Sequence, residues 1–147
     1  MADRTAHVTW EGSLTEGSGT IDEVGSGAFG AFGPLPVTWA ARSEAASGGR
    51  TSPEELIAAA HAACFSMALS NGLAKDGTPP ERLETSAVVT FVPGTGITKS
   101  ALTVRGRVPG LDADGFRAAA ETARTSCPVS QALAGVPEIT LDASLES

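Results

Sequence analysis

Lysine and cysteine are both scarce in this sequence, and each scarcity excludes a class of protein. Lys75 and Lys99 are the only lysines among 147 residues, and the formal net charge is −7. Proteins that bind nucleic acid or anionic membrane surfaces need clusters of Lys and Arg, so neither class is expected. Neither a signal peptide nor a transmembrane run is evident, so we expect a cytoplasmic protein.

The two cysteines, Cys64 and Cys127, are too few for a structural disulfide framework in a cytosolic chain of this length. They are either buried apolar residues or redox-active ones. Hydrophobic residues make up 41% of the sequence and charged residues 18%, which is typical of a globular protein. A chain of 147 residues is long enough for one sizeable core but not for two, so we expect a single domain over residues 1–147.

One helix, expected from Ser52 to Leu73, is the centre of the sequence pattern. Ser52 suits the N-cap, Pro53 suits the first turn, and Glu55 completes a capping box with Ser52. From residue 56 to residue 69 nearly every side chain is apolar or small. A helix that is apolar on every side is buried on every side. We therefore expect this helix to lie between a sheet and another body, for which a second subunit is the obvious candidate.

The remaining pattern predicts an α+β fold with antiparallel sheets packed on this helix. Alternating residues and turn signals predict strands at residues 7–10, 20–24, 35–41, 83–92, 97–108 and 138–145. The fourth and fifth of these form a hairpin, with Leu102 and Val104 on one face. Asp114 is expected to cap a second helix that runs to about residue 125. The apolar face of that helix is formed by Phe116, Ala119, Ala120 and Ala123.

Residues 25–30 contain the glycine pattern G-x-G-x-x-G. The dinucleotide-binding form of this motif needs a strand before it and a helix after it. Pro34 and Pro36 follow here instead, and proline blocks a helix interior. We therefore interpret this segment as a flexible glycine-rich loop rather than a nucleotide site.

Cys64 lies in the middle of the predicted central helix, and this position decides whether it can react. Only the thiolate is a strong nucleophile, and at a pKa of about 8.5 only about 3% of a thiol is ionised at pH 7. Burial raises the pKa further, and Cys64 lies beyond the first turn, where the helix dipole acts. A reactive Cys64 therefore needs a cation from elsewhere in the fold, and without one it is an inert core residue.

Arg42 is a candidate for that cation, because it is expected at the end of a strand just before the loop that leads to the helix. Glu54 is able to hold the guanidinium in a bidentate pair. The local sequence by itself favours a solvated Arg42 at a strand end and a first-turn Glu54 that only favours the helix dipole. Arg50 competes with Arg42 for the same role.

A second cysteine, Cys127, stands before a proline at the expected end of the second helix. Two cysteines allow a two-step redox reaction, in which a thiolate attacks a peroxide to give a sulfenic acid and the second thiol condenses with it to a disulfide. The alternative is a pair of inert core cysteines, which are common in buried positions.

His61 shares a helix face with Cys64 and suggests either zinc or a Cys–His nucleophile for acyl transfer. A structural zinc site takes four ligands, usually in tight pairs, and no such pair exists here. No oxyanion loop or glycine turn surrounds Cys64 either. A core histidine with satisfied nitrogens is therefore the favoured interpretation.

Residues 51–70 resemble the motif around the reactive cysteine in the OsmC branch of the OsmC/Ohr peroxiredoxins, and residues 127–133 resemble the resolving-cysteine motif of that family. Residues 10–12, Trp-Glu-Gly, are similar to the OsmC opening. The resemblance is to OsmC rather than Ohr because His-Ala-Ala precedes Cys64 and Val-Ser-Gln follows the Cys-Pro pair at Cys127. Together the motifs span nearly the whole chain.

The resemblance implies an OsmC-like fold in an intertwined homodimer whose two active sites each draw on both subunits. It implies reduction of organic hydroperoxides, and of hydrogen peroxide less well, with Cys64 peroxidatic and Cys127 resolving. Arg42 and Glu54 correspond to the arginine–glutamate pair that activates the thiolate. Electrons come from a dithiol reductant, often a lipoyl group, and neither a metal nor another cofactor is needed. The alternative is a dimeric redox-sensing or small-ligand-binding module that uses the same cysteines without efficient turnover.

Overall fold

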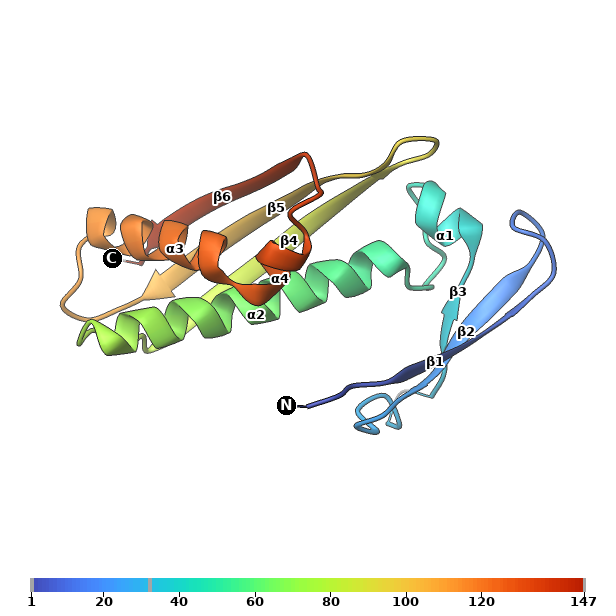
Figure 1. Cartoon of the computed structure of the whole chain (residues 1–147), viewed down its shortest axis with the longest axis horizontal. Coiled ribbons are helices and arrows are strands. Elements are labelled where there is room, and N and C mark those ends of the chain that lie inside the picture. The colour runs from blue at the N-terminus through green and yellow to red at the C-terminus, as the bar shows by residue number, and fades with distance from the viewer. Residues whose placement is uncertain (1, 32, 147) are drawn as a thin grey trace. The chain divides into compact units, whose positions relative to one another are not determined.

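The computed structural model describes residues 2–31 and 33–146 and confirms the α+β class. In chain order the elements are β1 (Ala6–Glu11), β2 (Ser18–Val24), β3 (Leu35–Val37), α1 (Trp39–Ser43), α2 (Pro53–Lys75), β4 (Arg82–Val92), β5 (Gly96–Arg107), α3 (Ala113–Ser126), α4 (Pro128–Ala132) and β6 (Glu138–Leu145) (Figure 1). They form two compact units, Met1–Pro53 and Glu54–Ser147, and each unit is described by itself.

The first unit is built on one antiparallel sheet in the order β1-β2-β3. The first two predicted strands are confirmed, with Thr9 opposite Thr20. Ile21 is buried on this sheet. The glycine-rich segment after β2 leads into the short strand β3, so within the described residues 25–31 and 33–34 the helix that a dinucleotide site needs does not follow.

The expected strand at residues 35–41 is wrong beyond Val37, where the chain enters the short helix α1. Thr38 takes the N-cap of α1, and its hydroxyl accepts a hydrogen bond from the N–H of Ala41 at 3.1 Å. The residues that follow include two alanines and an arginine, which favour a helix. Arg42 therefore lies in the last turn of a helix, not at the end of a strand.

The second unit contains the sheet β4-β5-β6. β4 and β5 form the predicted antiparallel hairpin. Antiparallel sheets are expected from the sequence, but β6 pairs with β5 in parallel, with Leu141 opposite Leu102. The connection explains the difference, because α3 and α4 intervene and return the chain to the end at which β5 begins.

The hydrophobic core of the second unit lies between this sheet and the helices α2 and α3 (Figure 1). Alternate residues of β5 face it, among them Leu102 and Val104 as predicted. Gly106 continues this row, and a Cβ there would lie 2.5 Å from the ring of Phe116. Glycine at this position therefore lets α3 approach the sheet closely. The core also contains Phe65, Leu69, Leu73, Val108, Ala120, Ala123 and Cys127.

Helix α3 begins earlier than expected, because Asp112 rather than Asp114 is its N-cap. The Asp112 carboxylate accepts a hydrogen bond from the N–H of Gly115 at 2.7 Å. Asp114 lies inside the first turn, where its charge suits the helix dipole. The predicted apolar face is confirmed, with Phe116, Ala120 and Ala123 buried and Ala119 partly buried against the core.

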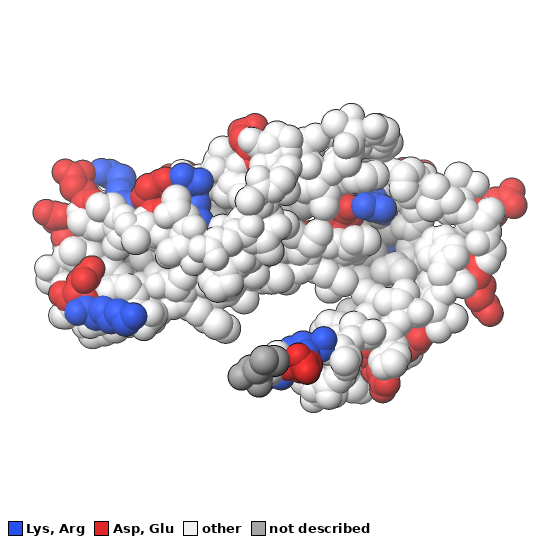
Figure 2. Space-filling view, in the orientation of Figure 1, with Lys and Arg blue, Asp and Glu red and all other residues white. Residues whose placement is uncertain are grey.

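Helix α2 confirms the predicted central helix. His61, Phe65 and Leu69, spaced four residues apart, are buried along one face of it. The opposite face is exposed in the single chain and carries Met67, which is 72% exposed, among exposed alanines. Length and hydropathy alone would also suit a membrane span, but the buried face packs in a protein core. Figure 2 shows a broad uncharged surface over α2 and α4.

Candidate active site

The two cysteines, far apart in the sequence, come together in the second unit. Cys64 is half-buried on α2, and Cys127 is fully buried at the junction of α3 and α4. Both are free thiols, and they lie close enough together for each to shift the pKa of the other. Two thiols in this contact are placed to form a disulfide once one of them is oxidised.

The position of Cys127 follows from the break between α3 and α4. Its backbone N–H donates to the carbonyl of Ala123 at 2.9 Å and closes α3, while its own carbonyl accepts from the N–H of Gln131 at 3.0 Å and starts α4. Pro128 follows directly, and proline has no N–H and suits only the first turn of a helix. The first helix therefore ends at this cysteine and a new one begins.

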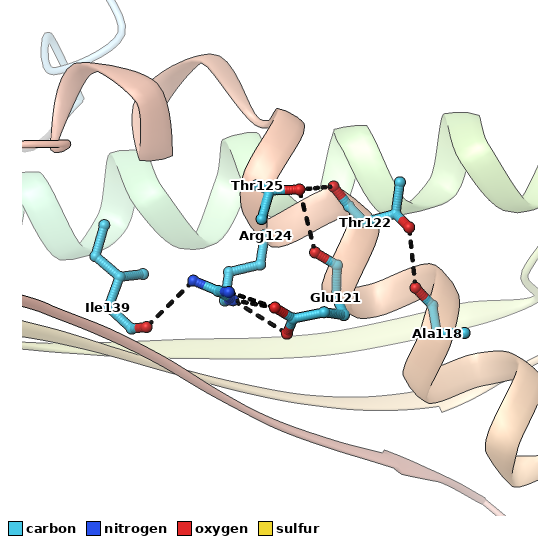
Figure 3. A network of polar contacts seen from close by, with 6 residues as sticks. All are labelled: Ala118, Glu121, Thr122, Arg124, Thr125 and Ile139. Atoms are coloured by element: carbon cyan, nitrogen blue, oxygen red, sulfur yellow. Dashed lines mark hydrogen bonds and ion pairs between the residues drawn. The ribbon is translucent and has the colours of Figure 1, made fainter.

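A polar network holds the last turn of α3 against β6 (Figure 3). The guanidinium of Arg124 pairs with the carboxylate of Glu121 and donates to the carbonyl of Ile139 in β6 at 3.3 Å. The hydroxyl of Thr125 turns back to the carbonyls of the preceding turn. Because Cys127 follows two residues after Thr125, this network fixes the position of the junction between α3 and α4 at which Cys127 lies.

The surroundings of the two thiols shift their pKa values in opposite directions. Burial raises the pKa of the Cys64 thiol, and so does its hydrogen bond to Cys127. Burial alone would also raise the pKa of Cys127, but hydrogen bonds from Cys64, from the N–H groups of Ser130 and Val129 and from the Ser130 hydroxyl together lower it. Within this unit Cys127 is the more acidic thiol, so Cys64 needs a cation to become the nucleophile, as its sequence position predicts.

The residues expected to activate Cys64 lie at the start of α2 and before it. Glu54 is buried in the first turn of α2. Arg42 lies in α1, where its guanidinium faces the ring of Trp39 at 6.0 Å from the centroid. Arg50 lies in the loop before α2 and is exposed. Both arginines belong to the first unit and both cysteines to the second, so the pairing of Arg42 with Glu54 and its approach to Cys64 stay predictions.

The first unit also holds an apolar pocket of about 220 Å³ beside Arg42. Its walls include Trp10, Leu14, Val37 and Trp39, and Arg42 is the charged side chain among the lining residues. A pocket of this composition suits an apolar group with one polar end near the guanidinium. The lining residues come from separate elements, so the sequence alone does not predict this pocket, and its two tryptophans were the available signal.

His61 is fully buried and uses both ring nitrogens. Nδ1 lies 2.7 Å from the hydroxyl oxygen of Ser100 on β5, and Nε2 lies 2.8 Å from that of Ser130 on α4. It is the satisfied core histidine that the sequence favours, since serine hydroxyls occupy both nitrogens. The two serines were not predicted from the sequence, although a histidine inside an apolar helix indicates that each ring nitrogen needs a partner.

Burial lowers the pKa of His61, which makes stability depend on pH below neutrality. As pH falls from about 7.5 to about 5.5, the unfolded chain takes up a proton that the folded chain does not, so the free energy of unfolding falls by up to about 1.4 kcal/mol per pH unit below about 6.5. His61→Gln is expected to lose this component, which urea unfolding of both proteins across that range measures. Equal pH slopes for the two proteins would contradict the prediction, because the exposed His7 is common to both.

Residues 46–142 match the family model described as OsmC-like protein. Peroxiredoxin OsmC of Escherichia coli strain K12 is 44% identical to this chain over 141 residues, which cover 94% of this chain and 93% of that protein. The segment matched by the family model contains Glu54, Cys64 and Cys127, and Arg42 precedes it.

Solved structures share the fold along nearly the whole chain. The organic hydroperoxide resistance protein OsmC of Legionella pneumophila has a TM-score of 0.64 and 23% identity, and the match covers 95% of this chain and 96% of that one. The organic hydroperoxide resistance protein of Elizabethkingia anophelis has a TM-score of 0.66 and 21% identity, with 97% and 96% covered. At these identities the structures support the fold alone, and the expected OsmC-like fold is confirmed.

Proposed function

The chain belongs to the OsmC-like protein family and is a peroxide-reducing oxidoreductase, and we propose that it reduces organic hydroperoxides with the thiol pair Cys64 and Cys127. The observation that carries the proposal is the close approach of these two thiols, which lets each shift the pKa of the other. Both lie in the segment that the family model matches. We place this chemistry in defence against oxidative and osmotic stress.

In the first step Cys64 is the nucleophile. Its thiolate attacks the outer oxygen of the hydroperoxide, the O–O bond breaks, and the alkoxide takes a proton and leaves as an alcohol. The sulfur of Cys64 loses two electrons and becomes a sulfenic acid, while the peroxide gains two. The alcohol and the sulfenic acid together account for both oxygen atoms.

In the second step Cys127 resolves the sulfenic acid. The thiolate of Cys127 attacks the sulfur of Cys64, the S–S bond forms, the S–O bond breaks, and hydroxide takes a proton and leaves as water. A dithiol such as a lipoyl group then reduces the disulfide by thiol–disulfide exchange and returns both cysteines to thiols.

We assign the activating cation to Arg42. A guanidinium close to an acidic group lowers its pKa by about 1–3 units, which opposes the effect of burial on Cys64. Glu54, buried at the start of α2, is suited to hold that guanidinium in a bidentate pair. Arg50, in the loop between them, is the alternative cation.

The apolar pocket beside Arg42 suits the hydrocarbon part of an organic hydroperoxide. Burial of apolar surface contributes about 25 cal/mol for each Å² removed from water. Hydrogen peroxide has no such surface, so we expect it to react less well than a hydroperoxide with an alkyl or aryl group.

We further propose that the protein works as a homodimer in the cytoplasm. The exposed apolar face of α2 around Met67 is the kind of surface that a second copy covers. In the dimer implied by the family resemblance, each active site draws on both subunits, and we propose that Arg42 of one subunit serves Cys64 of the other. Two cysteines, too few for a structural disulfide framework, suit a reducing compartment.

One equivalent of cumene hydroperoxide, added to the reduced protein in the absence of oxygen, tests the proposed function. Both free thiols should disappear and the mass should fall by two units, because Cys64 and Cys127 end as a disulfide. Repeated turnover with dihydrolipoamide separates an enzyme from a redox sensor, which oxidises once and resets slowly. Thiols that stay reduced would contradict the two-cysteine mechanism, and oxidation without turnover would favour the sensor.

A further inference from the structure

The hydrogen bonds of His61 continue through one of its serines to the sulfur of Cys127. The hydroxyl of Ser130 lies 2.8 Å from Nε2 of His61 and also hydrogen-bonds to Cys127. On the other side of the ring, the hydroxyl of Ser100 lies 2.7 Å from Nδ1 of His61. Ser100, His61, Ser130 and Cys127 thus form one continuous chain of buried polar groups from β5 through α2 and α4 to the junction.

The protonation state of His61 determines which of these groups donate hydrogen bonds and which accept them. Burial lowers the pKa of His61, so the ring is neutral at pH 7 and has one N–H and one lone pair. When Nε2 carries the hydrogen, it donates to the oxygen of Ser130, and the O–H of Ser130 is left to donate to the sulfur of Cys127. Nδ1 then accepts from the hydroxyl of Ser100. Every buried group has a partner in this arrangement, and the last donor serves a thiolate.

Charged groups on the neighbouring elements are engaged elsewhere. On β5, Lys99 pairs with Glu138 of β6 at 2.9 Å, and on α3, Arg124 is paired within its own helix. The residues of α4 carry no charge. Among the residues that the structure describes, the titratable side chain that interacts with the Cys127 thiol is Cys64 on α2. Within the described residues of the second unit, a negative charge on Cys127 is therefore met by hydrogen-bond donors.

We propose that His61 is a positioning residue for the resolving step and acts through Ser130 on Cys127. The inference rests on the proposed function, because the partner of Cys127 in this step is the sulfenic acid of Cys64. As the Cys127 thiolate attacks that sulfur, the S–S bond forms, the S–O bond breaks, and the proton lost by Cys127 joins the departing hydroxide as water. His61 keeps the Ser130 hydroxyl turned toward the sulfur until the bond has formed.

Ser130→Ala tests this role by removing the link between His61 and Cys127. After one equivalent of cumene hydroperoxide, formation of the Cys64 sulfenic acid should keep its wild-type rate, whereas formation of the disulfide should slow about tenfold, as expected for a lost hydrogen bond to a charged group. Rapid quenching with dimedone, followed by mass spectrometry, reports the two steps separately. Ser66→Ala is the matched control, because it removes a hydroxyl from α2 that bonds to Thr85 instead.

The ionisation of Cys127 gives a second readout that a merely structural role would not move. In a Cys64→Ser background, ultraviolet absorbance of the thiolate should show the pKa of Cys127 raised by about one unit in Ser130→Ala. His61→Gln should raise it in the same direction with Ser130 intact. The slowed disulfide step should recover as pH is raised, because more of Cys127 is then ionised.

A matched pair of variants covers the case in which Ser130→Ala does not fold. Threonine and valine side chains have nearly the same shape, but only threonine keeps the hydroxyl. Ser130→Thr should therefore preserve fast disulfide formation, and Ser130→Val should not. Equal rates for this pair, or an unchanged pKa of Cys127, would overturn the inference while leaving the peroxidase intact. If wild-type Cys64 is not oxidised at all, the proposed function itself fails, which is a different result.

Discussion

Cys64→Ser is expected to abolish peroxide reduction, with a loss of about 10³-fold or more in kcat/KM for cumene hydroperoxide. A serine hydroxyl is not ionised near neutral pH, and the imidazole on the same helix, His61, is already bonded to two serines. Steady-state consumption of the peroxide with a dithiol measures the loss. Serine is close to cysteine in size and Cys64 is only half-buried, so a thermal unfolding midpoint near that of the wild type is the control.

Cys127→Ser is the informative companion to that variant. It should still form the sulfenic acid once, because Cys64 and its activating groups are unchanged. The sulfenic acid then lacks its resolving thiol, accumulates, and is open to further oxidation by a second equivalent of peroxide. A dimedone adduct on Cys64, found in Cys127→Ser and absent from Cys64→Ser, assigns the two roles.

The opposite assignment is a real competitor, because hydrogen bonds within the second unit make Cys127 the more acidic of the two thiols. If they alone decided which thiol attacks, Cys64→Ser would carry the adduct on Cys127. That outcome would contradict the proposed roles. The assignment to Cys64 therefore depends on the cation that we propose from outside the unit. The half-buried state of Cys64 also gives peroxide better access than the fully buried Cys127.

Local features of the fold were predictable from the sequence. The central helix carries its own start signal in Ser52 and Pro53, and β6 matches the predicted strand at residues 138–145. The predictions that were wrong concern places where two local structures compete or where strands distant in the sequence pair. Thr38 can continue a strand or cap a helix, and the hydrogen bond to Ala41 decides for the helix. The parallel pairing of β6 depends on β5, which is distant in the sequence and leaves no local signal.

The same distinction between local and long-range features applies to the candidate site. Cys64 and Cys127 are recognisable because each stands in a motif, and in the structure each thiol shifts the pKa of the other. The partners of His61 are not recognisable, because Ser100 and Ser130 look like ordinary surface serines until the fold buries them. A polar residue in an apolar helix indicates that it has hydrogen-bond partners, but only the tertiary structure shows which residues these partners are.

Arg42→Met is expected to slow the oxidation of Cys64 by about 10- to 100-fold at pH 7, because loss of a nearby cation raises the pKa of the thiol by about 1–2 units. The rate should recover as pH rises, since more thiolate then forms without the cation. Arg42→Lys should recover only part of the rate, because lysine keeps the charge but cannot form the bidentate pair with Glu54. Arg50→Met is the matched control, and a larger loss there than in Arg42→Met would transfer the role to Arg50.

Co-expression of an impaired variant and an inactive one shows whether Arg42 acts across a subunit boundary. If the chain is a homodimer in which Arg42 of one subunit serves Cys64 of the other, co-expressed Arg42→Met and Cys64→Ser chains form heterodimers with one complete site, and activity should return to about one quarter of the wild-type value for random pairing. Residual activity of Arg42→Met is subtracted as background. A mixed dimer of the right mass with no recovered activity would mean that Arg42 serves the cysteine of its own chain. A protein that is monomeric by light scattering would remove the dimer and with it the explanation for the exposed apolar face of α2.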